Sequence, residues 1–146
     1  MKYPEPFKQY IRDMARFCAD QTYHGRFEIS MGWEPDTSDV DTDNTSCPFS
    51  CLILFEYLTI NIDVYPVALK MWKAKDYRQI AKSVLHEVCH LIHDPLQHLA
   101  LDNANAQKRE EVRKATEEQT SHLTVVLWRL FEMAHGDGWY MPKVKK

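Results

Sequence analysis

The chain of 146 residues is long enough to bury a hydrophobic core, and we expect one domain over residues 1–146. Its composition, 45% hydrophobic and 27% charged, is typical of a globular protein, and the net charge of −3 argues against nucleic acid or an anionic membrane as a partner. Residues 1–20 are rich in charge and lack the apolar region of a signal peptide, and no stretch is as apolar as a membrane span. We therefore expect a cytoplasmic protein whose four cysteines are reduced thiols.

The first half of the chain predicts a helix followed by strands. Apolar residues at helical spacing indicate an amphipathic helix over residues 5–20, and strict alternation over residues 26–33 indicates a half-buried strand. Residues 34–48 are polar and predict a surface loop. Residues 49–65 are too long for one ordinary strand, so we expect two strands or one bent strand, ended by Pro66.

The second half predicts two helices. Asp76 and Gln79 have the spacing of a capping box, and the helix that follows is expected to end near residues 94–95, because a residue before proline disfavours helical geometry. A long helix is predicted over residues 105–134, with Gly136 as its C′ residue.

Each of these helices has a predicted buried side. On the first helix the apolar residues on one side are Tyr77, Ile80, Ala81, Val84, Val88, Leu91 and Ile92. The histidines expected on its opposite side are His86, His90 and His93. The predicted buried stripe of the second helix is Val112, Leu123, Leu127, Leu130 and Ala134.

The run His86-Glu87-Val88-Cys89-His90 is an H-E-x-x-H motif on the first of these helices. Four residues are a little over one helical turn, so both imidazoles project from the same side and can share one metal ion. Glu87 is then placed to reach a water bound to that metal. The motif predicts a zinc hydrolase with His86 and His90 as ligands and Glu87 as the catalytic base. The alternative is a helix whose histidines simply face solvent.

Catalytic zinc needs a third protein ligand. Glu117 lies at the flank of the second helix's apolar stripe, beside Thr120 and Thr124, whereas Glu118 points close to solvent. We therefore predict Glu117 as the third ligand. The alternatives that the sequence leaves open are Glu118, His98 and His122.

Two further motifs have ordinary explanations. Residues 39–43 resemble the start of a calcium loop, but Asn44 and Ser50 stand where glycine and glutamate are needed, so a solvated acidic loop is preferred. Cys47 and Cys51 are spaced C-x₃-C without a matching second pair, which favours reduced thiols over a metal clip.

The run from Ser83 to Leu91, together with Glu117-x-x-Thr120-x-x-Leu123, resembles the active-site helices of minimal gluzincin-like metallopeptidases. These are zincins similar to small phage and bacterial proteins of the SprT-like and ImmA/IrrE-like kind, and the likeness spans about residues 26–134. The resemblance implies an α+β zincin-like fold, with an N-terminal helix, a small mixed β-sheet, the H-E-x-x-H helix and a long C-terminal helix. It also implies Zn²⁺-dependent hydrolysis of peptide bonds, with an extended peptide held at a strand edge within residues 51–64.

Two points stay open on the sequence alone. The runner-up function is a regulatory or binding protein of zincin fold, with a structural or vestigial zinc and no turnover. A donor to the oxyanion is often needed as well. The side chains with suitable chemistry are His122, His135 and Tyr140.

Overall fold

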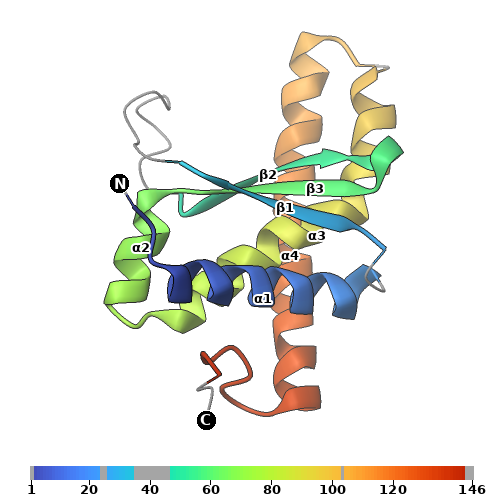
Figure 1. The fold of residues 1–146 in the computed structure, drawn as a ribbon. Coiled ribbons are helices and arrows are strands. Elements are labelled where there is room, and N and C mark those ends of the chain that lie inside the picture. The colour runs from blue at the N-terminus through green and yellow to red at the C-terminus, as the bar shows by residue number, and fades with distance from the viewer. Residues whose placement is uncertain (1, 24–25, 35–46, 103, 144–146) are drawn as a thin grey trace.

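The computed structural model describes residues 2–23, 26–34, 47–102 and 104–143. Its elements are α1 (Glu5–Tyr23), β1 (Glu28–Trp33), β2 (Phe49–Leu54), the 3₁₀-helix η1 (Phe55–Tyr57), β3 (Thr59–Val64), α2 (Pro66–Lys73), α3 (Tyr77–Asp102) and α4 (Ala106–His135). Within the described residues the fold is α+β, with four α-helices and one three-stranded sheet (Figure 1). In that part of the chain, no helix combines the length and the apolar character needed to cross a membrane. The acidic run 39–43 lies outside the described residues.

The sheet is mixed and has the strand order β1-β3-β2. β1 pairs with β3 in parallel and β2 pairs with β3 in antiparallel, with Ile29 and Ile53 both opposite Ile60. The prediction of two strands over residues 49–65 is therefore confirmed. Every second residue of β3, from Ile60 to Val64, is fully buried, because successive side chains point to opposite faces. β2 lies at an edge of the sheet.

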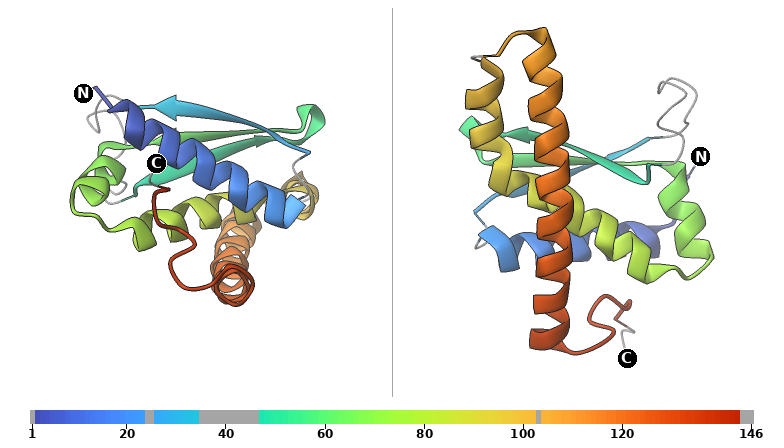
Figure 2. Two further views of the ribbon diagram at one scale, coloured as in Figure 1. Left: turned by 60° about the horizontal axis from the view of Figure 1, so that its bottom comes forward. Right: turned by 180° about the vertical axis from the view of Figure 1, so that it is seen from behind.

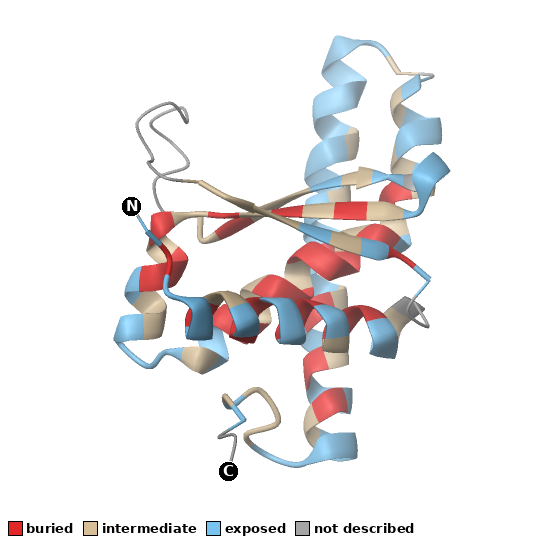
Figure 3. Ribbon diagram, in the orientation of Figure 1, coloured by how far each residue is buried: buried red, intermediate tan, exposed pale blue. Residues whose placement is uncertain are grey.

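Two helices cover one face of the sheet, and the core lies between them and the strands. Figure 2 shows α1 and α3 on the same side of the sheet, with α4 crossing α3 on its far side. Figure 3 shows the buried residues gathered where α1, α3 and the sheet meet. The predicted apolar side of α1 is confirmed, since Phe7, Ile11 and Cys18 are fully buried. This packing holds α3 firmly, and α3 is the helix that carries the H-E-x-x-H motif.

α3 begins as predicted but does not end where it was expected to end. The side chain of Asp76 accepts a hydrogen bond from the backbone N–H of Gln79 (3.3 Å), so Asp76 caps the helix. The predicted end near residues 94–95 is wrong, because the helix continues through Pro95 to Asp102. Proline removes one backbone donor and favours a kink, and α3 bends part-way along its length (Figure 1). The last turns of α3 lie beside the first turns of α4 (Figure 1), and most of their side chains are exposed.

Two side chains of α3 differ from the expected pattern. Ile92, predicted on the buried side, is 37% exposed. His93 does not share the open side with the other two histidines, since its Nε2 atom is buried. Beyond Leu91 the helix leaves the sheet and packs chiefly on α4, so the buried direction changes there.

α2 was not predicted. Pro66 ends the strand segment as expected, but it also begins a helix, a position where its missing N–H costs nothing. Tyr65 is the N-cap and makes no capping bond through its side chain, so the usual sequence signal for a helix start is missing. Ala68 and Leu69 are buried and attach this short helix to the core.

α4 follows the predicted boundaries closely. The side chain of Asn105 accepts a hydrogen bond from the backbone N–H of Lys108 (3.0 Å), and Gly136 ends the helix with a φ of +82°. The predicted stripe is wrong at Leu130, which is 50% exposed, and at Ala134, which is exposed. The residues of α4 that are buried are Thr120, Thr124, Trp128 and Phe131. The apolar pattern leaves out threonine. The predicted stripe is therefore displaced around the helix axis by one residue from the side that is buried.

Candidate metal centre

α3 places His86 and His90 one turn apart on the side that faces a groove. The opposite side of the helix, which includes Val84, Val88 and Leu91, is fully buried and fixes the rotation of the helix about its axis. The two imidazole rings lie with their centroids 5.0 Å apart and their planes nearly perpendicular, at 87°. Both side chains are about one-fifth exposed, so the rings are held in place and still reachable from the groove.

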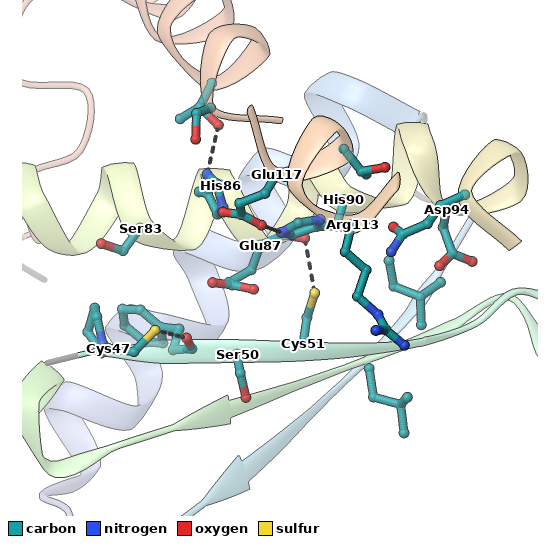
Figure 4. Close-up of a pocket in the computed structure, with 18 of the residues that line it drawn as sticks. Cys47, Ser50, Cys51, Ser83, His86, Glu87, His90, Asp94, Arg113 and Glu117 are labelled. Carbon is teal, nitrogen blue, oxygen red and sulfur yellow. Dashed lines mark hydrogen bonds and ion pairs between the residues drawn. The ribbon is translucent and has the colours of Figure 1, made fainter. Parts of the chain in front are cut away.

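α4 brings Glu117 to both histidines, as the close-up in Figure 4 shows. Oε1 of Glu117 lies 2.8 Å from Nε2 of His86, and Oε2 lies 3.4 Å from Nε2 of His90. One ligand atom from each of the three residues falls within 4.8 Å of the others. Two imidazole nitrogens and a carboxylate oxygen are a donor set that zinc accepts, so these three residues could hold a zinc ion.

The alternative third ligands lie elsewhere. Glu118 is exposed and is not in this group, although it is next to Glu117 in the chain. His98 pairs with Asp94, with 3.1 Å between Nε2 and Oδ1. His122 is exposed on α4 and is also outside the group. The structure thus brings together the three residues that the sequence selected as ligands.

Two buried threonines of α4 contact the other nitrogen of each histidine. Oγ1 of Thr120 lies 3.5 Å from Nδ1 of His90, and Oγ1 of Thr124 lies 3.5 Å from Nδ1 of His86. Thr124 donates its own proton to the carbonyl of Thr120 (2.8 Å), so its oxygen is available to accept the proton on Nδ1 of His86. The 2.8 Å contact of Nε2 of His86 with Oε1 of Glu117 is a hydrogen bond that Nε2 donates; with a metal between these two atoms, the proton of a neutral His86 would instead be on Nδ1, where Thr124 can accept it. The sequence placed these threonines beside Glu117 but did not assign them this role.

The electrostatics of the site favour a neutral His90. Burial lowers the pKa of His90, the neighbouring His86 and His93 act in the same direction, and Glu117 acts against them. A metal ligand must be the unprotonated imidazole. Burial therefore prepares His90 for a metal at neutral pH.

Glu87 lies beside this group and points from α3 toward β2 (Figure 4). It is only 8% exposed, and burial, together with the negative charge of Glu117, raises its pKa from 4.5 to about 7, while a hydrogen bond with Cys51 acts in the opposite direction. A carboxylate with a pKa near the working pH is suited to accept and return a proton. Glu87 is not one of the three grouped ligands, which leaves its carboxylate free for this task.

Cys47 and Cys51 are free thiols on the β2 side of the site. Cys51 donates to the backbone carbonyl of Glu87 (Sγ to O, 3.5 Å), and Cys47 donates to the carbonyl of Phe49 (2.7 Å). Burial and the charge of Glu87 raise the pKa of Cys51, so its thiol stays protonated. Both cysteines lie outside the grouped ligands, so the C-x₃-C spacing does not form a clip with them.

No family model, no curated protein and no solved structure matches this chain.

The grouped ligands open into a groove of about 780 Å³ between β2, α3 and α4. Its walls are residues 47–53 along β2, the side of α3 from Gln79 to His98, and the side of α4 from Arg113 to Thr124. Glu87, His86 and His90 lie mid-way along the α3 wall of this groove.

The residues considered as oxyanion donors do not line this groove. His135 packs against Phe17 at the other end of α4, with 5.1 Å between the ring centroids. Tyr140 packs on Trp128, and its backbone carbonyl accepts a hydrogen bond from Tyr10 (2.8 Å). These side chains belong to the packing of the C-terminal segment.

Proposed function

We propose that this protein is a zinc-dependent metallopeptidase of the zincin kind, in which Glu87 activates water for hydrolysis of a peptide bond. The observation that carries the proposal is the meeting of His86, His90 and Glu117 within 4.8 Å, next to the buried carboxyl of Glu87. Two ligands come from one turn of α3 and the third comes from α4. The packing of these two helices therefore sets the geometry of the site.

Each residue of the site has a distinct part in the reaction. When bound, zinc lowers the pKa of water toward 7 and polarises a substrate carbonyl. Glu87 takes a proton from the attacking water at a carboxylate oxygen and then gives it to the leaving amine. Thr120 and Thr124 orient the imidazoles through Nδ1. The buried position of Glu87 keeps its carboxylate out of bulk water, where it would be a weaker base.

β2 provides the surface that holds the substrate. It is an edge strand, and its other edge has no strand partner within the described residues. An extended peptide can add to such an edge by main-chain hydrogen bonds. Because residues 47–53 form a wall of the groove, a peptide bound there would lie alongside Glu87. This arrangement favours a peptide or protein substrate over a small molecule.

The number of protein ligands also bears on whether the proposed zinc is catalytic or purely structural. Structural zinc sites are closed by four protein ligands, whereas catalytic sites keep one position open. Within the described part of the chain the group contains three ligands and faces a groove. These two features support a hydrolase over a regulatory protein with a structural zinc.

The direct test of the proposed activity is cleavage of a proteome-derived peptide library by the zinc-loaded protein. We expect cleavage by the wild type, loss of cleavage by at least a thousandfold in Glu87→Gln with zinc retained, and normal cleavage by the control Glu118→Gln. An inactive zinc-loaded wild type, or a Glu87→Gln protein with full turnover, would remove the proposal.

A further inference from the structure

Charged residues of both signs line the groove outside the three grouped ligands. The acidic residues there are Glu87 and Asp94. Oδ1 of Asp94 pairs with His98 at 3.1 Å, and Oδ2 is buried without a hydrogen-bond partner among the described residues. The basic residues of the lining, apart from its histidines, are Lys82 and Arg113.

Arg113 lies one helical turn before Glu117 on α4, and Figure 4 shows it reaching across the groove toward β2. Four residues of helix correspond to about 6 Å, so its guanidinium belongs to the groove immediately beyond the metal centre. The ion pair that it makes within the described residues is with Glu110, at 3.8 Å, and both side chains are more than half exposed. An ion pair this long and this exposed contributes little to stability, so a ligand can readily replace Glu110 as the partner of Arg113.

Lys82 lies at the other end of the groove, one turn before His86 on α3. Its ammonium group is 5.3 Å from the ring centroid of Trp128, a cation–π contact that directs the chain without neutralising its charge. The groove therefore carries a cation on each side of the metal centre, although the chain as a whole is acidic. Each cation attracts a ligand carboxylate that lies close to it.

We infer that Arg113 is a substrate-binding residue, and that the groove selects peptides with an aspartate or glutamate within two residues of the cleaved bond. This inference rests on the proposed peptidase function. An extended peptide advances about 3.3 Å per residue, so the turn of helix between Glu117 and Arg113 spans about two substrate residues. The planar guanidinium can bind a carboxylate through two parallel hydrogen bonds, which makes Arg113 the stronger of the two cations for this purpose.

The inference is tested by binding, separately from turnover. The probes are two fluorescein-labelled, alanine-rich peptides with blocked ends and a central leucine, which carry either aspartate or asparagine two positions to each side of it. The protein is zinc-loaded Glu87→Gln, alone and combined with Arg113→Glu. The control combination is Lys114→Glu, which makes the same change of charge one residue away but outside the groove lining. Fluorescence anisotropy gives the dissociation constants at low salt.

We expect the aspartate peptide to bind about fivefold more tightly than the asparagine peptide, the upper range for an exposed ion pair. Arg113→Glu should abolish or reverse this preference, and Lys114→Glu should keep it. Equal affinities in the parent protein, an unchanged preference in Arg113→Glu, or no binding of either peptide would overturn the inference. Library cleavage without enrichment of acidic residues beside the cleaved bond would overturn it while leaving the peptidase function intact. A binding preference without any cleavage would support it and remove the peptidase function.

Discussion

The hydroxyl oxygen of Thr124 lies 3.5 Å from Nδ1 of His86, and its proton is already donated to the carbonyl of Thr120. α4 therefore contributes to the site in two ways, because it carries Glu117 on one turn and contacts the two imidazoles of α3 from the next two turns. Groups that hydrogen-bond to the other ring nitrogen of a histidine ligand commonly set the tautomer and the orientation of that histidine. In the proposed zinc site, the contact between Thr124 and His86 predicts a zinc affinity that depends on a residue outside the group of ligands.

The first prediction concerns this threonine. Thr124→Val keeps the shape of the side chain and removes the oxygen that accepts from His86, so zinc affinity should fall about tenfold or more. Thr124→Ser should keep most of the affinity. Thr116→Val is the matched control, because Thr116 lines the groove but donates to the carbonyl of Val112 instead of contacting a histidine. Competition with a chromophoric chelator gives the zinc affinity of all four proteins. Equal affinities of the wild type and Thr124→Val would refute the role of Thr124 in holding His86.

The second prediction concerns the buried carboxyl of Glu87 in the metal-free protein. Its pKa is raised from 4.5 to about 7 by burial, so the folded state favours the protonated form. The stabilisation is complete below the unfolded pKa and is lost as the pH rises through 7. A shift of this size corresponds to about 3 kcal/mol. Glu87→Gln does not titrate, so its stability relative to wild type should increase by about that amount between pH 4.5 and pH 8.

Urea unfolding of the metal-free proteins at the two pH values measures this difference. Glu118→Gln serves as the control, because its side chain is exposed and should show no such change. If the stability of Glu87→Gln relative to the wild type does not depend on pH, the carboxyl of Glu87 is solvated in the folded protein. That result would contradict the buried position of Glu87 beside the site.

The third prediction concerns the continuation of α3 through Pro95. Proline inside a helix removes a hydrogen bond and crowds the preceding turn at a cost of about 3 kcal/mol, while its stiffness in the unfolded chain returns up to about 1 kcal/mol. Pro95→Ala should therefore raise the free energy of unfolding by about 2 kcal/mol, as measured by urea denaturation. A neutral or destabilising result would indicate that the helix ends at residue 94, as the sequence alone suggested.

The sequence predicted the fold where local signals are strong. Periodicity located α1, the strands and α4, and the caps Asp76 and Asn105 marked two helix starts. It missed α2, whose N-cap Tyr65 makes no side-chain capping bond. It also ended α3 too early, because the preference of a residue before proline for extended geometry is only a bias, and the helix continues through Pro95 to Asp102.

The candidate site was predictable where local sequence patterns determine it. His86 and His90 are fixed relative to each other by helix geometry, and the choice of Glu117 over Glu118 followed from its side of α4. The contacts of Thr120 and Thr124 with the imidazoles depend on how α3 and α4 cross, which no local pattern encodes. The same crossing brings Arg113 over the groove.

Zinc titration of the metal-free protein, with Glu117→Ala and Glu118→Ala measured beside the wild type, tests the central claim most directly. The account predicts one equivalent of tightly bound zinc in the wild type and in Glu118→Ala. It predicts a loss of at least a hundredfold in affinity in Glu117→Ala, because only two imidazoles remain to hold the metal. Failure of the wild type to bind one equivalent, or an equal loss in both variants, would contradict a site built from His86, His90 and Glu117.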